Sequence, residues 1–129
     1  MKYYFQKTLF HTGFDEVVQK VKEELKKEGF GILSEIDVQN TLKKKLDVDF
    51  NKYTILGACN PPFAYEALQT EIHIGTMLPC NVVIMEKEDG KINVFAVEPV
   101  ASMMAVGNRK LNTVARKIQK KLEKVIKGL

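Results

Sequence analysis

The sequence predicts an α+β fold, in which two long helices cover one face of a mainly antiparallel five-stranded sheet. Two long segments, one after Thr12 and one from Asn108 to about Lys127, carry apolar residues at helical spacing. Five shorter segments are rich in β-branched and aromatic residues, which favour strands. The Asp89-Gly90 turn between the last two of these segments predicts a hairpin, and hairpin strands run antiparallel.

The elements follow one another in the order β-α-β-α-β-α-β-β-α, in which the two inner helices are short. The strands are expected at residues 2–10, 30–36, 53–59, 81–87 and 92–97. A short helix is expected at 38–46, a second one at about 62–71, and an apolar helical connection at 100–106. The length of 129 residues fits a single domain, 1–129, with one core.

The first long helix is expected to bury one face. Thr12 and Asp15 form a plausible capping pair at its start, and Gly29 supplies a C-terminal glycine at its end. Its apolar residues fall within an arc of roughly 100° on a helical wheel. They are Phe14, Val17, Val18, Val21 and Leu25.

The last helix has one apolar side and one strongly basic side. The apolar side consists of Leu111, Val114, Ala115, Ile118, Leu122, Val125 and Ile126. The opposite side consists of Arg109, Lys110, Arg116, Lys117, Lys120, Lys121, Lys124 and Lys127. This pattern therefore predicts a helix with one side facing the core and a cationic side facing outward.

The short elements have recognisable start signals. Asp37 stands at the N-cap position of the helix 38–46. Asn60 is expected to cap the helix that follows the third strand, because Pro61 and Pro62 stop the strand and are tolerated in a first helical turn. Gly75 and Pro79 mark the loop that leads into the fourth strand.

Both cysteines lie in this central stretch, and each is followed by an asparagine. The third strand ends in Cys59-Asn60-Pro61, and the fourth begins in Leu78-Pro79-Cys80-Asn81. If the two strands pair antiparallel, Cys59 and Cys80 meet at one end of the sheet. A parallel crossover would instead separate them by roughly 20 Å, the length of a six-residue strand.

This arrangement resembles the domain of unknown function 302 family of small bacterial and archaeal proteins. The resemblance also covers Glu28-Gly29-Phe30-Gly31, Asp37-Val38, Glu98-Pro99 and the basic last helix. It implies a two-layer fold with the TATA-binding-protein-like β-α-β4-α arrangement, and a homodimer. It implies no established activity.

Composition and cysteine count favour a cytoplasmic protein without a membrane segment. The chain is 45% hydrophobic and 28% charged, which is ordinary for a soluble globular protein. Two cysteines are too few for a disulfide framework, and Lys7 interrupts any apolar signal core near the start. The uncharged run 100–108 is far shorter than the ~20 residues that span a bilayer.

The candidate site is a small-ligand pocket where the two Cys-Asn motifs meet, and the expected function is a dimeric ligand-binding or sensor module. Its expected residues are Cys59, Asn60, Pro61, Pro79, Cys80, Asn81 and Glu98. Alternatives are a thiol-dependent enzyme, or a soft-metal site that uses the cysteines with Met103 or Met104. Both cysteines could also be structural, since free cysteine is commonly buried.

Enzymatic and nucleic-acid functions are less favoured. His11 and His73 lie outside the central motif, so no base is evident for a thiol nucleophile, and no catalytic residue, cofactor or metal site is identified. The net charge of +4 and the basic last helix suggest nonspecific anion binding, but that helix has no aromatic residues for base stacking. A homodimer is expected because the runs 82–85 and 94–97 do not alternate with polar residues and need a second cover.

Overall fold

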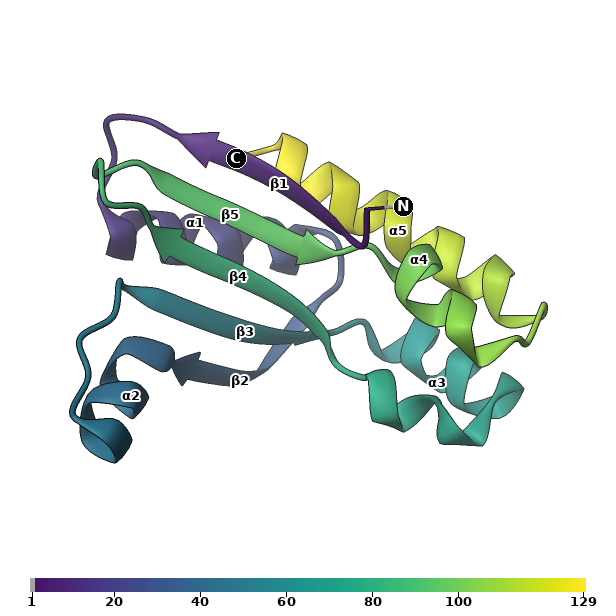
Figure 1. Cartoon of the computed structure of the whole chain (residues 1–129). Coiled ribbons are helices and arrows are strands. Elements are labelled where there is room, and N and C mark those ends of the chain that lie inside the picture. The colour runs from purple at the N-terminus through teal and green to yellow at the C-terminus, as the bar shows by residue number, and fades with distance from the viewer. Residues whose placement is uncertain (1) are drawn as a thin grey trace.

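The computed structural model describes residues 2–129 and confirms the predicted α+β fold. The strands are β1 (Tyr4–Leu9), β2 (Gly31–Asp37), β3 (Tyr53–Cys59), β4 (Cys80–Glu86) and β5 (Ile92–Val97). They form one antiparallel sheet in the order β1-β5-β4-β3-β2 (Figure 1). β4 is therefore the central strand.

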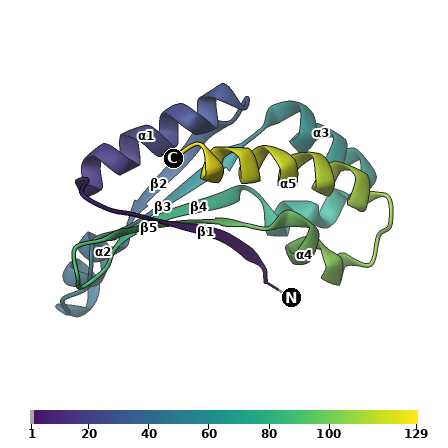
Figure 2. The same cartoon turned by 90° about the horizontal axis from the view of Figure 1, so that it is seen from above.

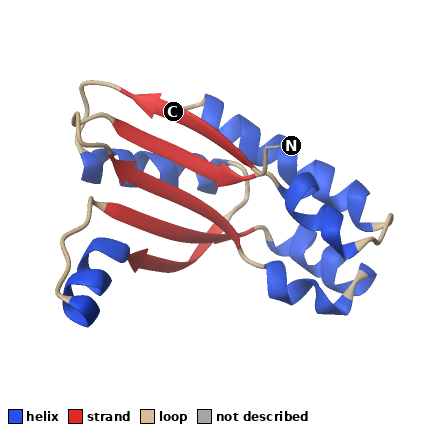
Figure 3. Cartoon of the chain, viewed as in Figure 1, coloured by secondary structure: helices blue, strands red, loops and turns tan. Residues whose placement is uncertain are grey.

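Two long helices, α1 (Phe14–Lys27) and α5 (Leu111–Lys127), cover one face of the sheet (Figure 2). The shorter elements are α2 (Val38–Leu46), α3 (Pro61–Thr70), η1 (Ile72–Met77), α4 (Pro99–Met103) and η2 (Met104–Val106), where η denotes a 3-10 helix. Helices α3 and α4 gather at the end of the sheet opposite α2 (Figure 3). This is the end at which β3 and β5 finish and β4 begins.

The core lies between the sheet and the two long helices. Alternate residues of the strands point into it, including the fully buried Leu56, Val82 and Ile84. The predicted apolar side of α5 is confirmed, because all seven of its residues are buried, and Phe14 is the one partly buried member of the α1 set. Each fully buried aliphatic side chain contributes roughly 1.5–3 kcal/mol to stability.

Several predicted caps and turns are confirmed. Asp37 caps α2, where its Oδ1 accepts a hydrogen bond from the backbone N–H of Asn40 at 2.9 Å. Gly29 ends α1 with φ +86°, and Gly90 occupies the hairpin turn with φ +85°, a region that favours glycine.

Other local predictions were wrong. The capping pair of Thr12 and Asp15 does not form, because Gly13 holds the N-cap position of α1 and no side chain caps it. Asn60 holds the N-cap position of α3, but its side chain makes no cap hydrogen bond. Residues 72–77, expected as a loop, form η1. The last helix begins at Leu111 rather than Asn108.

Helix α2 stands apart from the core. It lies on the side of the sheet away from α1 and α5 (Figure 2), and none of its nine residues, all of which the structure describes, is buried. Leu46, which follows Val38 and Leu42 at spacings of four, is 66% exposed. The apolar spacing therefore predicted the helix correctly, although the helix packs little apolar surface.

Gly57 in β3 allows a close approach of β2 and the turn before β4. A Cβ atom at this position would come within 2.9 Å of Pro79 Cγ and closer still to Ser34 Oγ. We expect Gly57→Ala to destabilise the fold by about 1–3 kcal/mol, because overpacking forces neighbours to move. Urea unfolding measures this, with Gly75→Ala as a control, since a Cβ there meets nothing within 4 Å. Equal stability of the two variants would contradict this description of the strand packing.

Candidate functional site

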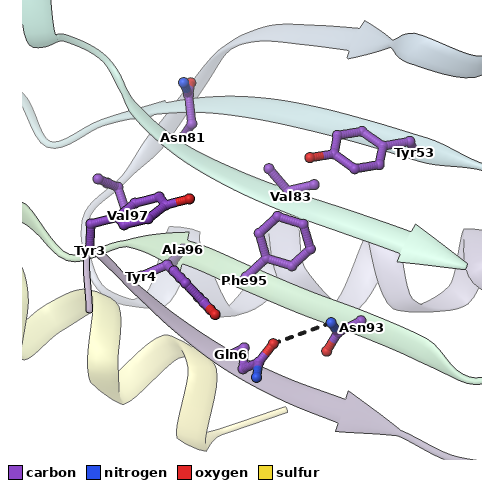
Figure 4. Close-up of a pocket in the computed structure, with 10 residues that line it drawn as sticks. All are labelled: Tyr3, Tyr4, Gln6, Tyr53, Asn81, Val83, Asn93, Phe95, Ala96 and Val97. Carbon is purple, nitrogen blue, oxygen red and sulfur yellow. Dashed lines mark hydrogen bonds between the residues drawn. The ribbon is translucent and has the colours of Figure 1, made fainter. Parts of the chain in front are cut away.

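The face of the sheet opposite α1 and α5 is not covered by a helix layer (Figure 2), and we call it the open face. Alternation along the strands places on it the residues that do not point into the core, such as Val83 of β4 and Phe95 of β5. It contains a groove of about 470 Å³, which we call the open-face groove. Its lining residues are Tyr3, Tyr4, Gln6, Tyr53, Asn81, Val83, Asn93, Phe95, Ala96 and Val97 (Figure 4).

Aromatic rings form the centre of the open-face groove. The ring of Phe95 lies 6.4 Å from that of Tyr4 and 6.1 Å from that of Tyr53, measured between centroids, and both pairs are edge-to-face. Tyr3 extends the cluster, with its ring 5.1 Å from that of Tyr4. Such edge-to-face pairs are a favourable aromatic geometry, so the rings support one another without a helix above them.

Polar groups surround these rings, and none of the ten lining residues is charged. The Asn93 amide donates to Gln6 Oε1 at 3.3 Å and its carbonyl accepts from Thr8 Oγ1 at 3.2 Å. Figure 4 marks the Gln6–Asn93 bond. Among the lining residues drawn there, the Asn81 amide and the three tyrosine hydroxyls make no hydrogen bond with one another or with the Gln6–Asn93 pair.

A second cavity, the strand-end pocket, lies where β3 ends and β4 begins. Its volume is about 270 Å³. Helix α3 contributes Ala64 and Leu68 to its wall, and α5 contributes Ile118. The other lining residues are Phe30, Leu33, Ala58, Cys59, Asn60, Leu78, Pro79 and Cys80.

The strand register confirms that the two cysteines lie at the same end of the sheet. β3 and β4 are antiparallel, and Ala58 pairs with Cys80, so Cys59 is one residue beyond that pair. Both cysteines are free thiols. Burial raises the pKa of the Cys80 thiol to about 11, and the neighbouring Cys59 adds to the rise. The environment of Cys80 therefore disfavours its thiolate.

No base accompanies these thiols in the strand-end pocket. None of its eleven lining residues is a histidine, lysine or arginine. His73 lies in η1, where its Nδ1 is 3.0 Å from Glu71 Oε2, and His11 lies in the turn after β1. Within residues 2–129, no group of three or more His, Cys, Asp or Glu side chains is placed to hold a metal ion.

The seven sequence-predicted site residues do not all meet. Cys59, Asn60, Pro79 and Cys80 line the strand-end pocket. Pro61 is the exposed first residue of α3 and is not part of the pocket lining.

Asn81 and Glu98 do not line the strand-end pocket. Asn81 lies on the open face and lines the open-face groove, because successive residues of a strand point to opposite faces. Glu98 caps α4, where its two carboxylate oxygens accept from the backbone N–H groups of Val100 and Ala101 at 2.9 and 3.0 Å. The single predicted site is thus divided between two cavities and a helix cap.

Asn60 has a structural contact that the sequence did not reveal. Its side chain is 8% exposed and donates from Nδ2 to the backbone carbonyl of Glu28 at 3.0 Å. This bond joins the start of α3 to the end of α1. The Asn60 amide therefore serves the packing of the pocket wall.

The basic side of α5 is partly neutralised by acidic side chains of other elements. Lys117 lies 3.4 Å from Glu66 of α3, and Lys121 and Lys124 lie 3.8 and 3.6 Å from Glu28. These contacts reduce the charge that the helix offers to an external anion.

Apart from Asn81, the aromatic and amide residues of the open-face groove were not predicted as site residues. Tyr4, Tyr53, Asn93 and Phe95 come from three strands that are distant in sequence. Alternation along a strand indicates which residues share a face. It assigns these four residues to the open face only once the strand order and register are known.

No helix among the residues that the structure describes is long and apolar enough to cross a membrane. A comparison with curated proteins found no match.

Comparison with solved structures found the crystal structure of an uncharacterised conserved DUF302 protein from Bacillus stearothermophilus. It matches with a TM-score of 0.91 and 27% sequence identity, over 98% of this chain and 98% of that chain. The family model described as a domain of unknown function, DUF302, matches residues 5–129. This match spans nearly the whole chain, and the protein therefore belongs to the DUF302 family.

Proposed function

We propose that this protein is a small-molecule-binding or sensor module that holds a compact apolar ligand in the strand-end pocket. The observation that carries the proposal is the cavity of about 270 Å³ at the point where Cys59 and Cys80 meet. Ligand sites are usually preformed concave pockets with mainly apolar walls. A volume just below the usual range of roughly 300–1,000 Å³ favours a ligand smaller than a typical drug molecule.

The wall chemistry supports an apolar ligand. Apart from Asn60 and the two thiols, every lining side chain is a hydrocarbon. The amide nitrogen of Asn60 is already hydrogen-bonded to Glu28. A polar ligand would lose its hydration without gaining equivalent partners, which costs free energy.

Binding fits this site better than thiol catalysis does. A nucleophilic cysteine needs a lowered pKa or an adjacent base. The pKa of Cys80 is raised by burial, and the pocket lining contains no histidine and no cation. Two thiols alone also make a poorer structural metal site than the four ligands that zinc takes.

We further propose that the protein forms a homodimer through the outer edge of β2. Exposed apolar side chains occur along β2, α2 and the loop to β3, and we call this set the edge patch. It consists of Leu33, Ile36, Leu46, Val48 and Phe50. The outer edge of β2 also carries backbone groups that pair with no other strand of the sheet. An apolar patch beside an unpaired strand edge is suited to a symmetric contact with a second copy.

Filling the strand-end pocket should abolish ligand binding. We expect toluene or hexanol to raise the melting temperature of the wild type by a few degrees at saturating concentration, because ligands that bind only the folded state stabilise it. Ala64→Leu should lose the rise, since its side chain projects into the pocket, whereas Ala101→Leu in α4 should keep it. No rise with any of these probes, or an equal rise in both variants, would contradict the proposed site.

A charge placed in the edge patch should break the dimer. We expect the wild type to sediment as a dimer at micromolar concentration and Leu46→Glu to sediment as a monomer, because the charge would be buried unpaired in the contact. Ile72→Glu is the control, since Ile72 is similarly exposed, at 71%, but lies in η1. A wild type that remains monomeric would refute the dimer, and a dimeric Leu46→Glu would place the contact elsewhere than in the edge patch.

A further inference from the structure

We propose that the open-face groove is a second binding site, for an uncharged planar heteroaromatic molecule. This site is separate from the strand-end pocket, because the two cavities share no lining residue. They also use opposite sides of β4: Cys80 points toward the core side, and Asn81 points into the groove. The inference therefore does not depend on the proposed function of the strand-end pocket.

The absence of charge in the groove lining determines the charge of the ligand. An exposed sheet face ordinarily carries charged side chains, yet the ten residues that line this cavity carry none. The Lys2 ammonium lies 5.6 Å from the centroid of the Tyr4 ring but is not part of the lining, so a phosphate or carboxylate ligand would find no cation among the lining residues to neutralise it. This argues for an uncharged ligand and against a nucleic-acid backbone.

The aromatic centre indicates a planar ligand. Phe95 is only partly buried, although Tyr4 and Tyr53 pack edge-on against it on either side. Val83 lies beside Phe95 in the middle of the groove (Figure 4). A flat aromatic surface covers such a cluster with large apolar contact at little entropic cost.

The polar groups at the two ends define the rest of the ligand. Met85 of β4 pairs with Asn93 of β5, so Asn81 and Asn93 are offset by four residues along neighbouring strands. This offset corresponds to about 13 Å along the strand direction. Figure 4 shows Val83 and Phe95 between the two amides. A ligand with an apolar planar body and hydrogen-bonding groups at its rim matches this order.

The side-chain amides of Asn81 and Asn93 differ in how available they are to hydrogen-bond a ligand. Asn93 is held by Thr8 and Gln6, which fixes its orientation. The side chain of Asn81 is exposed and makes no hydrogen bond with the other lining residues drawn in Figure 4. Asn81 is thus the group most available to a ligand, with the tyrosine hydroxyls beside it.

Lumichrome, an uncharged tricyclic heteroaromatic with an imide edge, is a suitable probe, and its fluorescence anisotropy reports binding. We expect saturable binding to the wild-type protein. Phe95→Ala, Asn81→Ala and Tyr53→Ala should each weaken it at least tenfold, while Tyr65→Ala should leave it unchanged. Tyr65 is an exposed tyrosine of α3 outside the groove. Acridine lacks the imide edge, so it should bind the wild type more weakly than lumichrome does. Its affinity for Asn81→Ala should equal its affinity for the wild type.

Three outcomes would overturn the proposal. The first is an absence of saturable lumichrome binding, and the second is a loss of affinity in Tyr65→Ala as large as that in Tyr53→Ala. The third is conversion of a dimeric wild type into a monomer by Asn81→Arg, which would identify the open face as a contact between copies. Circular dichroism verifies that each variant is folded, and the exposed Asn81 variants keep the test valid should Phe95→Ala unfold. Competition with hexanol separates the two sites, because hexanol has no aromatic ring, and its binding in the strand-end pocket should leave lumichrome binding intact.

Discussion

The antiparallel register between β3 and β4 is the constraint on which both candidate sites depend. Leu56 pairs with Val82 and Ala58 with Cys80, so these side chains face α1 and α5. Because side chains alternate along a strand, a slip of one residue would bring Asn81 into the core and expose Val82. The free-energy cost of burying an unpaired amide is several times the net free energy gained from an ordinary hydrogen bond. The sequence therefore favours the observed register over one shifted by a single residue.

The same register gives the central strand two functions. On one side of β4, Cys80, Val82 and Ile84 complete the core and part of the strand-end pocket. On the other side, Asn81 and Val83 line the open-face groove. Two long helices cover only the first side, so the second remains available to a ligand. Both sites therefore follow from one sheet with a cover on one face.

Much of the fold could be predicted because its signals are local. The helical spacing of Val17, Val21 and Leu25 and the Asp89-Gly90 turn depend on residues close in sequence. The sequence also indicated that Cys59 and Cys80 would meet, since that requires only antiparallel pairing of two strands.

The composition of the sites was harder to predict because it depends on contacts between distant segments. Asn60 looked like a helix cap, but its amide bonds to Glu28, which is 32 residues away. Glu98 looked like a ligand group, but its carboxylate caps α4. The groove unites Tyr4, Tyr53 and Phe95 from strands whose spatial order differs from their order in the chain.

The pH dependence of thiol alkylation tests most directly the claim that β4 buries Cys80 on the core side in a pocket without a base. Mass spectrometry after cleavage at glutamate separates the two cysteines, because Glu66 and Glu71 lie between them. The raised pKa of about 11 leaves about one Cys80 thiol in a thousand ionised at pH 8, so its alkylation should stay slow until the pH approaches 11. Alkylation of Cys80 that titrates at or below the free-thiol value of about 8.5 would contradict this account.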